Sequence, residues 1–250
     1  HAWRCGLTGL HDYDGPRAFQ AMQILRERGS LGLRIVKNIN DSYIEHAHAL
    51  GLRWCFGDEM LRLGGLKMFA DGAIGSLTAR MLEPYHEQPD NRGIVVMEKE
   101  KMRRLALEAT RRGFPSTIHA IGDEAVRDVL DVLEEVRKEE AKLCIPREAR
   151  RHRMEHVQII HPDDISRLGE LDVAASMQPL HATADYPIAD RYWGERSRYG
   201  YNPRIFLDSG ARVVFGSDSP VEPFDPLKGI HAAVTRQRAD GAPGPEGWYP

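Results

Sequence analysis

Residues 114–142 have the sequence FPSTIHAIGDEAVRDVLDVLEEVRKEEAK, which predicts a strand followed directly by a long helix. The run FPSTIHA is short and largely apolar, as expected for a buried strand. After it, from Asp123 to Lys142, apolar residues recur three and four apart, which predicts an amphipathic helix, at Val126, Val129, Leu130 and Leu133. His119 lies where the strand gives way to the turn.

The same alternation continues in both directions along the chain. Strand-like runs lie at 4–12, 31–39, 65–69, 114–120, 152–159, 171–179 and 211–219, and a helix, or a loop and a helix, follows each of these seven runs. Two long loops are predicted, at 70–97 and 180–202. Such repetition favours an α/β fold with a parallel sheet, and this many units favour a (β/α)8 TIM-type barrel. A complete barrel has eight units, so residues 1–250 are expected to form one incomplete barrel domain.

Four residues at the ends of these strands suggest a hydrolytic metal centre: Lys67, His119, His156 and Asp218. Strand ends converge at the C-terminal face of a barrel, where barrel enzymes keep their active sites. Histidine nitrogen and carboxylate oxygen are zinc ligands, and a catalytic site keeps one position open for water. Asp218 is expected both to bind metal and to exchange protons with that water. Lys67, if burial deprotonates it, could add carbon dioxide and offer a carbamate as a ligand.

Alternatives exist for each residue taken alone. His119 and His156 could be ordinary hydrogen-bonded residues, Lys67 an ordinary surface charge, and Asp218 a helix cap or turn residue. His119 and Asp218 could also form an acid–base pair without metal, which insensitivity to chelators would favour. Within 152–156, strand alternation places His152, Met154 and His156 on one face, with His156 nearest the C-terminal end.

His46 and His48 have the spacing of a metal-binding His-x-His pair, but they lie in a predicted helix. Side chains two residues apart on a helix differ by about 200° in direction around its axis, so the two histidines cannot bind the same ion. We expect both to be surface features of that helix.

Composition narrows the choice of partners. A net charge of −3 gives no electrostatic reason to expect nucleic acid or an anionic membrane as a partner, and no apolar stretch is long enough for a membrane helix. Three scattered cysteines, Cys5, Cys55 and Cys144, favour free thiols in a cytoplasmic protein. A small-molecule substrate is the remaining expectation.

Five segments together resemble amidohydrolase family 3, a branch of the metal-dependent amidohydrolases that includes N-substituted formamide deformylases: KMFADGAIGSLTARML, IHAIGDEAV, MEHVQIIHPDDI, SMQPLHATADY and FGSDSPVEPFDPLKGIHAAVTRQ. The resemblance implies a distorted barrel with an accessory β-sandwich, hydrolysis of a carbon–nitrogen bond, and one or two divalent metals, zinc above all. It assigns Lys67 as the carboxylated lysine, His119 and His156 as ligands, and Asp218 as ligand and general acid/base. It also places Asp71, His181 and Asp185 near the substrate.

One family feature is missing from the sequence. The family begins with a strand ending in His-x-His, and nothing before GLTGLHD (residues 6–12) matches it. We therefore expect a fragment that lacks the first barrel strand, with the β-sandwich outside this chain. The alternative is a catalytically silent barrel that binds a ligand or partner without turnover, and pairing with another copy, as a homo-oligomer, would cover its open edges.

Overall fold

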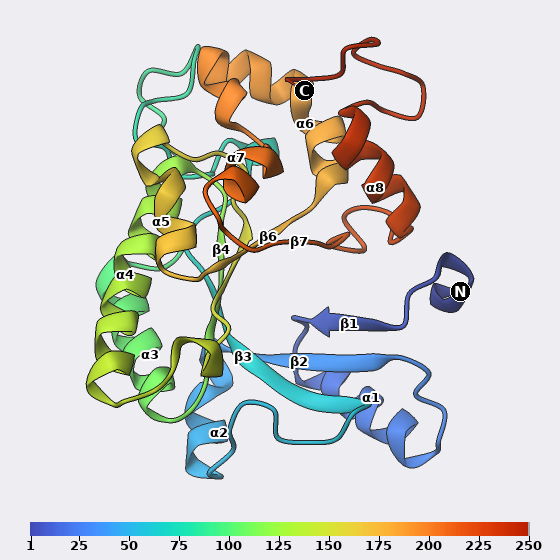
Figure 1. Cartoon of the computed structure of the whole chain (residues 1–250), viewed down its shortest axis with the longest axis vertical. Coiled ribbons are helices and arrows are strands. Elements are labelled where there is room, and N and C mark those ends of the chain that lie inside the picture. The colour runs from blue at the N-terminus through green and yellow to red at the C-terminus, as the bar shows by residue number, and fades with distance from the viewer. Residues whose placement is uncertain (250) are drawn as a thin grey trace.

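In the computed structural model, which describes residues 1–249, seven parallel strands form one sheet in the order in which they occur along the chain. The strands curl into an incomplete barrel in which β1 and β7, within these residues, each pair with only one neighbour (Figure 1). This confirms the predicted parallel α/β barrel and its missing unit. The strands are β1 (Gly9–Asp12), β2 (Arg34–Asn40), β3 (Leu61–Phe69), β4 (Ser116–Ala120), β5 (Arg153–His156), β6 (Ala174–Met177) and β7 (Val213–Phe215).

Helices follow the strands as predicted, with one exception described below. They are α1 (Pro16–Glu27), α2 (Ile44–Ala49), α3 (Lys99–Arg111), α4 (Asp123–Lys142), α5 (Ile165–Glu170), α6 (Pro179–Trp193), α7 (Pro203–Asp208) and α8 (Pro226–Thr235). Short 3-10 turns lie at Ala2–Cys5, Asp41–Tyr43, Ile74–Ser76, Arg147–Ala149, Pro162–Asp164 and Gly194–Tyr199. No helix within residues 1–249 has both the length and the apolar character needed to cross a membrane.

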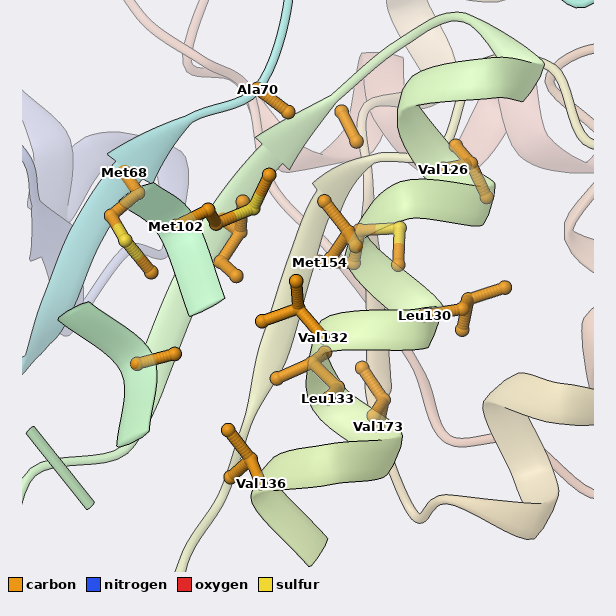
Figure 2. Close-up of a cluster of buried hydrophobic side chains, with 14 of the residues drawn as sticks. Met68, Ala70, Met102, Val126, Leu130, Val132, Leu133, Val136, Met154 and Val173 are labelled. Carbon is orange, nitrogen blue, oxygen red and sulfur yellow. The ribbon is translucent and has the colours of Figure 1, made fainter. Parts of the chain in front are cut away.

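The main hydrophobic core lies between the strands and the helices α3, α4 and α5. Figure 2 shows Val132, Leu133 and Val136 of α4 directed toward the strands, where Met154 is fully buried. On β3, β4 and β5 the residues on this helix-facing side are Leu66, Met68, Ile118 and Met154. By strand alternation, Lys67, His119 and Glu155 face the barrel interior. The core therefore fixes which side chains reach the site.

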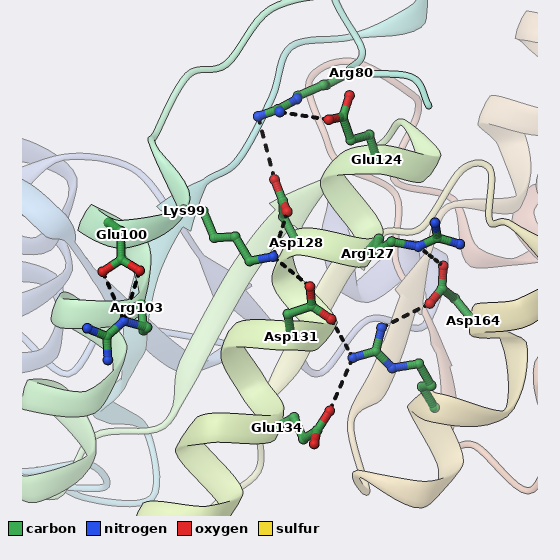
Figure 3. A network of polar contacts seen from close by, with 11 residues as sticks. Arg80, Lys99, Glu100, Arg103, Glu124, Arg127, Asp128, Asp131, Glu134 and Asp164 are labelled. Carbon is green, nitrogen blue, oxygen red and sulfur yellow. Dashed lines mark hydrogen bonds and ion pairs between the residues drawn. The ribbon is translucent and has the colours of Figure 1, made fainter. Parts of the chain in front are cut away.

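Ion pairs join the elements around the outside of α4. Asp128 pairs with Arg80 of the loop after β3 at 3.5 Å and with Lys99 of α3 at 3.0 Å, and Asp131 pairs with Arg167 of α5 at 2.7 Å (Figure 3). Single exposed ion pairs contribute little, but a network of several is a better candidate for stabilisation. This network ties the loop after β3 to the helix that follows β4.

Strand β3 is longer than predicted, because it begins at Leu61 and runs through two glycines. A Cβ atom on Gly65 would lie 2.6 Å from the Pro115 carbonyl oxygen, and one on Gly64 would lie 2.6 Å from Asn38 Oδ1. These glycines permit close approach of neighbouring chain segments instead of marking the strand's start.

The predicted loop at 180–202 is wrong, because most of it is helix α6 followed by a 3-10 turn. Pro187 lies inside this helix, although proline cannot donate to the carbonyl four residues earlier. That carbonyl, on Thr183, instead accepts a hydrogen bond from Arg238 Nε at 2.8 Å. A residue distant in the sequence thus supplies the missing donor, and the buried side chains of Ala189 and Trp193 pack the helix into a second core cluster.

The expectation for His48 is also corrected. His46 and His48 lie on a helix as predicted, and His46 is exposed, but His48 is buried. The ring of His48 packs against Phe114, with ring centroids 5.8 Å apart.

Candidate functional site

Three imidazole rings and one carboxylate meet at the C-terminal ends of the strands. The centroid of the His156 ring lies 4.5 Å from that of His119 and 5.9 Å from that of His181, with which it is stacked. Ligand atoms of His156, His181 and Asp218 all lie within 4.8 Å of one another. The structure therefore groups His156 and Asp218, which were predicted as ligands, with His181, which was predicted to face the substrate, and His119 meets this group through its contact with His156.

His156 joins this group through an unusual backbone conformation. Strand alternation predicted that it would share one face with His152 and Met154, and that prediction is wrong, because those two side chains face the helices and His156 does not. Its φ is 77°, and that of the next residue, Val157, is 44°. Positive φ values are uncommon for residues other than glycine and occur often at functional sites. The turn directs the ring toward His119 instead of toward the helices.

The tautomer of His156 follows from its hydrogen bond to Gln178. Nδ1 of His156 lies 2.8 Å from Gln178 Oε1, and the amide nitrogen of Gln178 donates to the Ser176 carbonyl at 3.1 Å. The amide orientation is thereby fixed, so Nδ1 must carry the proton and Nε2 keeps its lone pair. Burial lowers the pKa of His156 well below its usual value, which keeps the ring neutral.

His119 has the opposite tautomer. Its Nε2 lies 2.9 Å from the Gly72 carbonyl oxygen, which can only accept, so Nε2 carries the proton and Nδ1 keeps the lone pair. Burial, aided by the charge of Lys67, lowers the pKa of His119 to about 4. A neutral ring with a free lone pair is the form that binds metal.

His181 is oriented by a chain of hydrogen-bonding groups. Nε2 of the Gln158 amide lies 3.2 Å from His181 Nδ1, and its Oε1 lies 3.0 Å from the Tyr201 hydroxyl. That hydroxyl also lies 2.7 Å from Asp185 Oδ2. Burial raises the pKa of Tyr201 well above its usual value, so the phenol keeps one proton to donate.

In that orientation of the Gln158 amide the Tyr201 hydroxyl, which has one proton, would lie between two acceptors, so only the reversed orientation satisfies every member of this chain. A carboxylate accepts hydrogen bonds but does not donate them, so Tyr201 donates its single proton to Asp185 and accepts from the Gln158 NH2 group. The Gln158 carbonyl then faces His181 and receives the Nδ1 proton. Nε2 of His181 is left with its lone pair, and this buried atom has no hydrogen-bond partner in the described part of the chain. It lies 3.9 Å from Asp218 Oδ2.

Lys67 lies in the barrel interior below the histidines. Its ammonium nitrogen donates to the Met68 carbonyl at 3.2 Å and lies 4.0 Å from the centroid of the Phe69 ring. Burial lowers the pKa of Lys67 to about 8, with Glu155 and Asp218 opposing the shift. A substantial neutral fraction near neutral pH is what carbamate formation requires.

Asp218 is the most accessible of the four predicted ligands. It follows β7 with a φ of 55°, and its side chain is 36% exposed. Burial raises the pKa of its carboxyl group, while the neighbouring His181 and Lys67 lower it. A carboxylate with a raised pKa at the mouth of the site can accept a proton and return it.

Asp71 lies beside the site, but main-chain groups occupy its oxygens. The carboxylate accepts hydrogen bonds from the amide nitrogens of Arg80, Ile121 and Gly122 at 2.8 to 3.0 Å. Asp71 Oδ1 is also 3.5 Å from His119 Nε2. Asp71 thus joins the loop after β3 to the end of β4, and its contact with substrate stays a prediction, as does that of Asp185.

Sequence reasoning missed the residues that orient the histidines: Gln158, Gln178 and Tyr201. It also missed Tyr13, whose hydroxyl donates to Glu155 Oε1 at 2.8 Å in the barrel interior. One signal was available. Gln158 and Gln178 each follow the last residue of a strand by one or two positions, close to residues already marked as functional.

The donor set fits a divalent metal ion. His119 Nδ1 and His156 Nε2 are neutral nitrogen donors, and Asp218 adds a carboxylate, the mixture that zinc takes in hydrolytic sites. The unpartnered Nε2 of His181 is the clearest mark of a missing group, because buried polar atoms nearly always have partners.

Known proteins resemble this chain in sequence and structure. It is 33% identical over 186 residues to the putative amidohydrolase YtcJ of Bacillus subtilis, matching 74% of this chain and 34% of that protein. It is 27% identical over 187 residues to the N-substituted formamide deformylase of Arthrobacter pascens, covering 74% of this chain and 33% of that enzyme. The solved structure of an uncharacterized metal-dependent hydrolase from Pyrococcus horikoshii matches 94% of this chain and 46% of its own, with a TM-score of 0.80 and 29% identity.

The chain thus spans about a third of these curated relatives and about half of the solved structure. The family model matches residues 1–249, nearly the whole chain. The resemblance noted from five sequence segments is confirmed, and the chain belongs to the amidohydrolase family.

Proposed function

We propose that the protein hydrolyses a carbon–nitrogen bond in a small molecule, as a non-peptide amide, formamide or cyclic amide hydrolase that uses one or two divalent metal ions. The observation that carries this proposal is the convergence of His156, His181 and Asp218, with a buried imidazole nitrogen left unpartnered among them. Support comes also from the relative named for formamide deformylation, at 27% identity.

His119, His156, Asp218 and a carboxylated Lys67 would hold the metal, for which zinc suits the donor set best. When bound, the metal would polarise the carbonyl group and acidify the attacking water. Asp218 accepts the proton of that water and then delivers it to the departing nitrogen. His181, with a bare Nε2, is placed to accept a hydrogen bond from the substrate. Gln178 and Gly72 keep His156 and His119 in the tautomers that the site needs.

Replacing the acid–base residue tests this function. Asp218→Asn should lower kcat on a panel of N-substituted formamides and cyclic amides by about 10²- to 10⁴-fold, the range of general acid–base catalysis. Asp163→Asn is the matched control, because Asp163 is also an aspartate but its side chain is 81% exposed and its one ion-pair partner within residues 1–249 is His161. Turnover of Asp218→Asn at the level of Asp163→Asn would refute the proposal.

A second function, ligand binding without turnover, is favoured by the open sheet. β1 and β7 are not paired with each other in the part of the chain that the structure describes. Metal analysis and an activity assay of the purified chain distinguish the two functions. Stoichiometric zinc together with hydrolysis of any amide on the panel would exclude ligand binding without turnover. Hydrolysis that survives exhaustive chelation would instead favour a His119–Asp218 pair acting without metal.

A further inference from the structure

His48 lies outside the strand-end site and is buried without a partner. Its side chain is 1% exposed, and within residues 1–249 neither ring nitrogen has a hydrogen-bond partner. A neutral imidazole carries one donor and one acceptor, and buried polar atoms of this kind are nearly always satisfied. His48 therefore calls for a group that the protein chain alone does not supply.

Two carboxylates face this ring from two helices. Glu45 precedes His48 by three residues on α2, so the two side chains share one face of that helix. Glu108 comes from the last turn of α3. Ligand atoms of all three residues lie within 4.8 Å of one another, and His48 Nδ1 is 3.9 Å from Glu45 Oε1.

We propose that Glu45, His48 and Glu108 bind a divalent transition-metal ion, zinc by preference, at a site that joins α2 to α3. One nitrogen and two carboxylates are a common zinc donor set, with bonds of about 2.0 to 2.2 Å. At a tetrahedral angle two such bonds place their ligand atoms about 3.4 Å apart, so Glu45 and His48, now 3.9 Å apart, would need to close by only about 0.5 Å around one ion. The fourth position would be taken by water.

The charge of Arg112 beside the site is compatible with metal binding. Arg112 pairs with Glu108 Oε1 at 2.9 Å, which leaves the second oxygen of that carboxylate for the metal. Burial, followed by the charge of Arg112, lowers the pKa of His48, so the ring is neutral at physiological pH, as a ligand must be.

The role of this site is structural, since its three ligands come from α2 and α3 and none belongs to the strand-end site. α2 has six residues, too few to be stable as an isolated helix, and its Ile44 and Ala47 share a hydrophobic cluster with Ala106 and Ala109 of α3. A metal bridge would add a cross-link between the same two helices. The site does not depend on the proposed hydrolytic function.

Zinc binding to the purified protein tests the proposal. Wild-type protein should bind one zinc ion more than Glu45→Gln or Glu108→Gln, or hold that ion at least about tenfold more tightly, since even outer-shell changes weaken metal sites tenfold. His46→Gln is the control, because His46 is exposed on the same helix and should leave zinc binding unchanged. An anomalous difference map at the zinc edge should show a peak between the two glutamates and His48.

Two results would overturn the proposal. One is a map with zinc only at the strand ends. The other is the same zinc stoichiometry and affinity in Glu45→Gln, Glu108→Gln and wild type. That result would mean that the Glu45 side chain only rotates to accept a hydrogen bond from the His48 ring. Both glutamates are at least partly exposed, so their variants should fold. A zinc-induced rise in Tm that is larger for wild type and His46→Gln than for the glutamate variants would support the bridge independently of any activity.

Discussion

Nδ1 of His156 lies 2.8 Å from Oε1 of Gln178, and this contact determines which nitrogen of the histidine can bind a metal. The Gln178 amide cannot reverse, because its nitrogen donates to the Ser176 carbonyl. Either nitrogen of a neutral imidazole can bind a metal ion. The contact with Gln178 therefore selects Nε2 of His156 for this role, because that nitrogen keeps its lone pair.

Gln178→Ala should weaken zinc binding at the strand-end site by about 10- to 100-fold, the usual effect of removing a group that orients a metal-bound histidine. Gln178→Glu should retain binding, because a carboxylate still accepts the Nδ1 proton. Zinc titration measures both affinities, and the ¹⁵N NMR shifts of His156 report the tautomer in the metal-free protein. Equal affinity in the alanine variant and wild type would contradict a positioning role.

Lys67 should form a carbamate to an extent that rises with pH. Because burial lowers its pKa to about 8, its neutral fraction grows from about a tenth at pH 7 to about nine tenths at pH 9. ¹³C-labelled bicarbonate should give a carbamate NMR signal that follows this rise. Lys67→Arg should give none, since its guanidinium stays protonated. Lys67→Glu, which supplies a permanent carboxylate, should bind zinc better than Lys67→Arg. A carbamate signal of equal intensity in Lys67→Arg would mean that the carbamate forms on another amine.

The free energy of unfolding of the metal-free protein should decrease as the pH is lowered through the range in which His119 is protonated in the unfolded chain but still neutral in the folded one. The pKa of His119 is about 4 in the folded chain and near 6.5 when unfolded, so the unfolded state binds more protons between these values. The free energy of unfolding therefore decreases from pH 6.5 to pH 4, and His119 contributes at most about 3 kcal/mol to that loss. Urea unfolding in a chelator should show a shallower decline for His119→Asn. The same slope in both proteins would contradict this assignment.

The sequence predicted the features that depend on local periodicity. The apolar repeat of α4, the strand-like run before His119 and the alternation of the two kinds of element were sufficient for the parallel barrel and for the strand-end positions of Lys67, His119, His156 and Asp218. Parallel strands bring their C-terminal ends together without further information, so the meeting of His119 with His156 could be predicted too.

Features set by long-range contacts could not be predicted. Helix α6 tolerates Pro187 because Arg238 supplies a donor to Thr183 from 55 residues away. The ring of His156 faces His119 because the backbone of His156 has a positive φ, which no local sequence pattern predicted. The burial of His48 depends on Phe114 and on α3, and a helical repeat alone could not say which of His46 and His48 would face them.

Tyr201→Phe should release the tautomer of His181. The hydroxyl of Tyr201 donates its one proton to Asp185, so it can only accept from Gln158, and the amide is therefore held with its NH2 group toward Tyr201 and its carbonyl toward His181. Without the hydroxyl, the amide can turn and offer its nitrogen, which would move the imidazole proton from Nδ1 to Nε2 and remove the lone pair that faces Asp218. The ¹⁵N NMR shifts of His181 in the metal-free protein should change from one tautomer to a mixture, while those of His156 stay constant.

Tyr43→Phe is the control for Tyr201→Phe, because Tyr43 is 43% exposed and far from the chain of groups that ends at Asp185. Asp185→Asn should act in the same direction as Tyr201→Phe, since an amide can donate to the phenol and free its proton for Gln158. If His181 carries its proton on Nε2 in wild type already, the chain does not orient this residue, and His181 would then donate a hydrogen bond to substrate instead of accepting one.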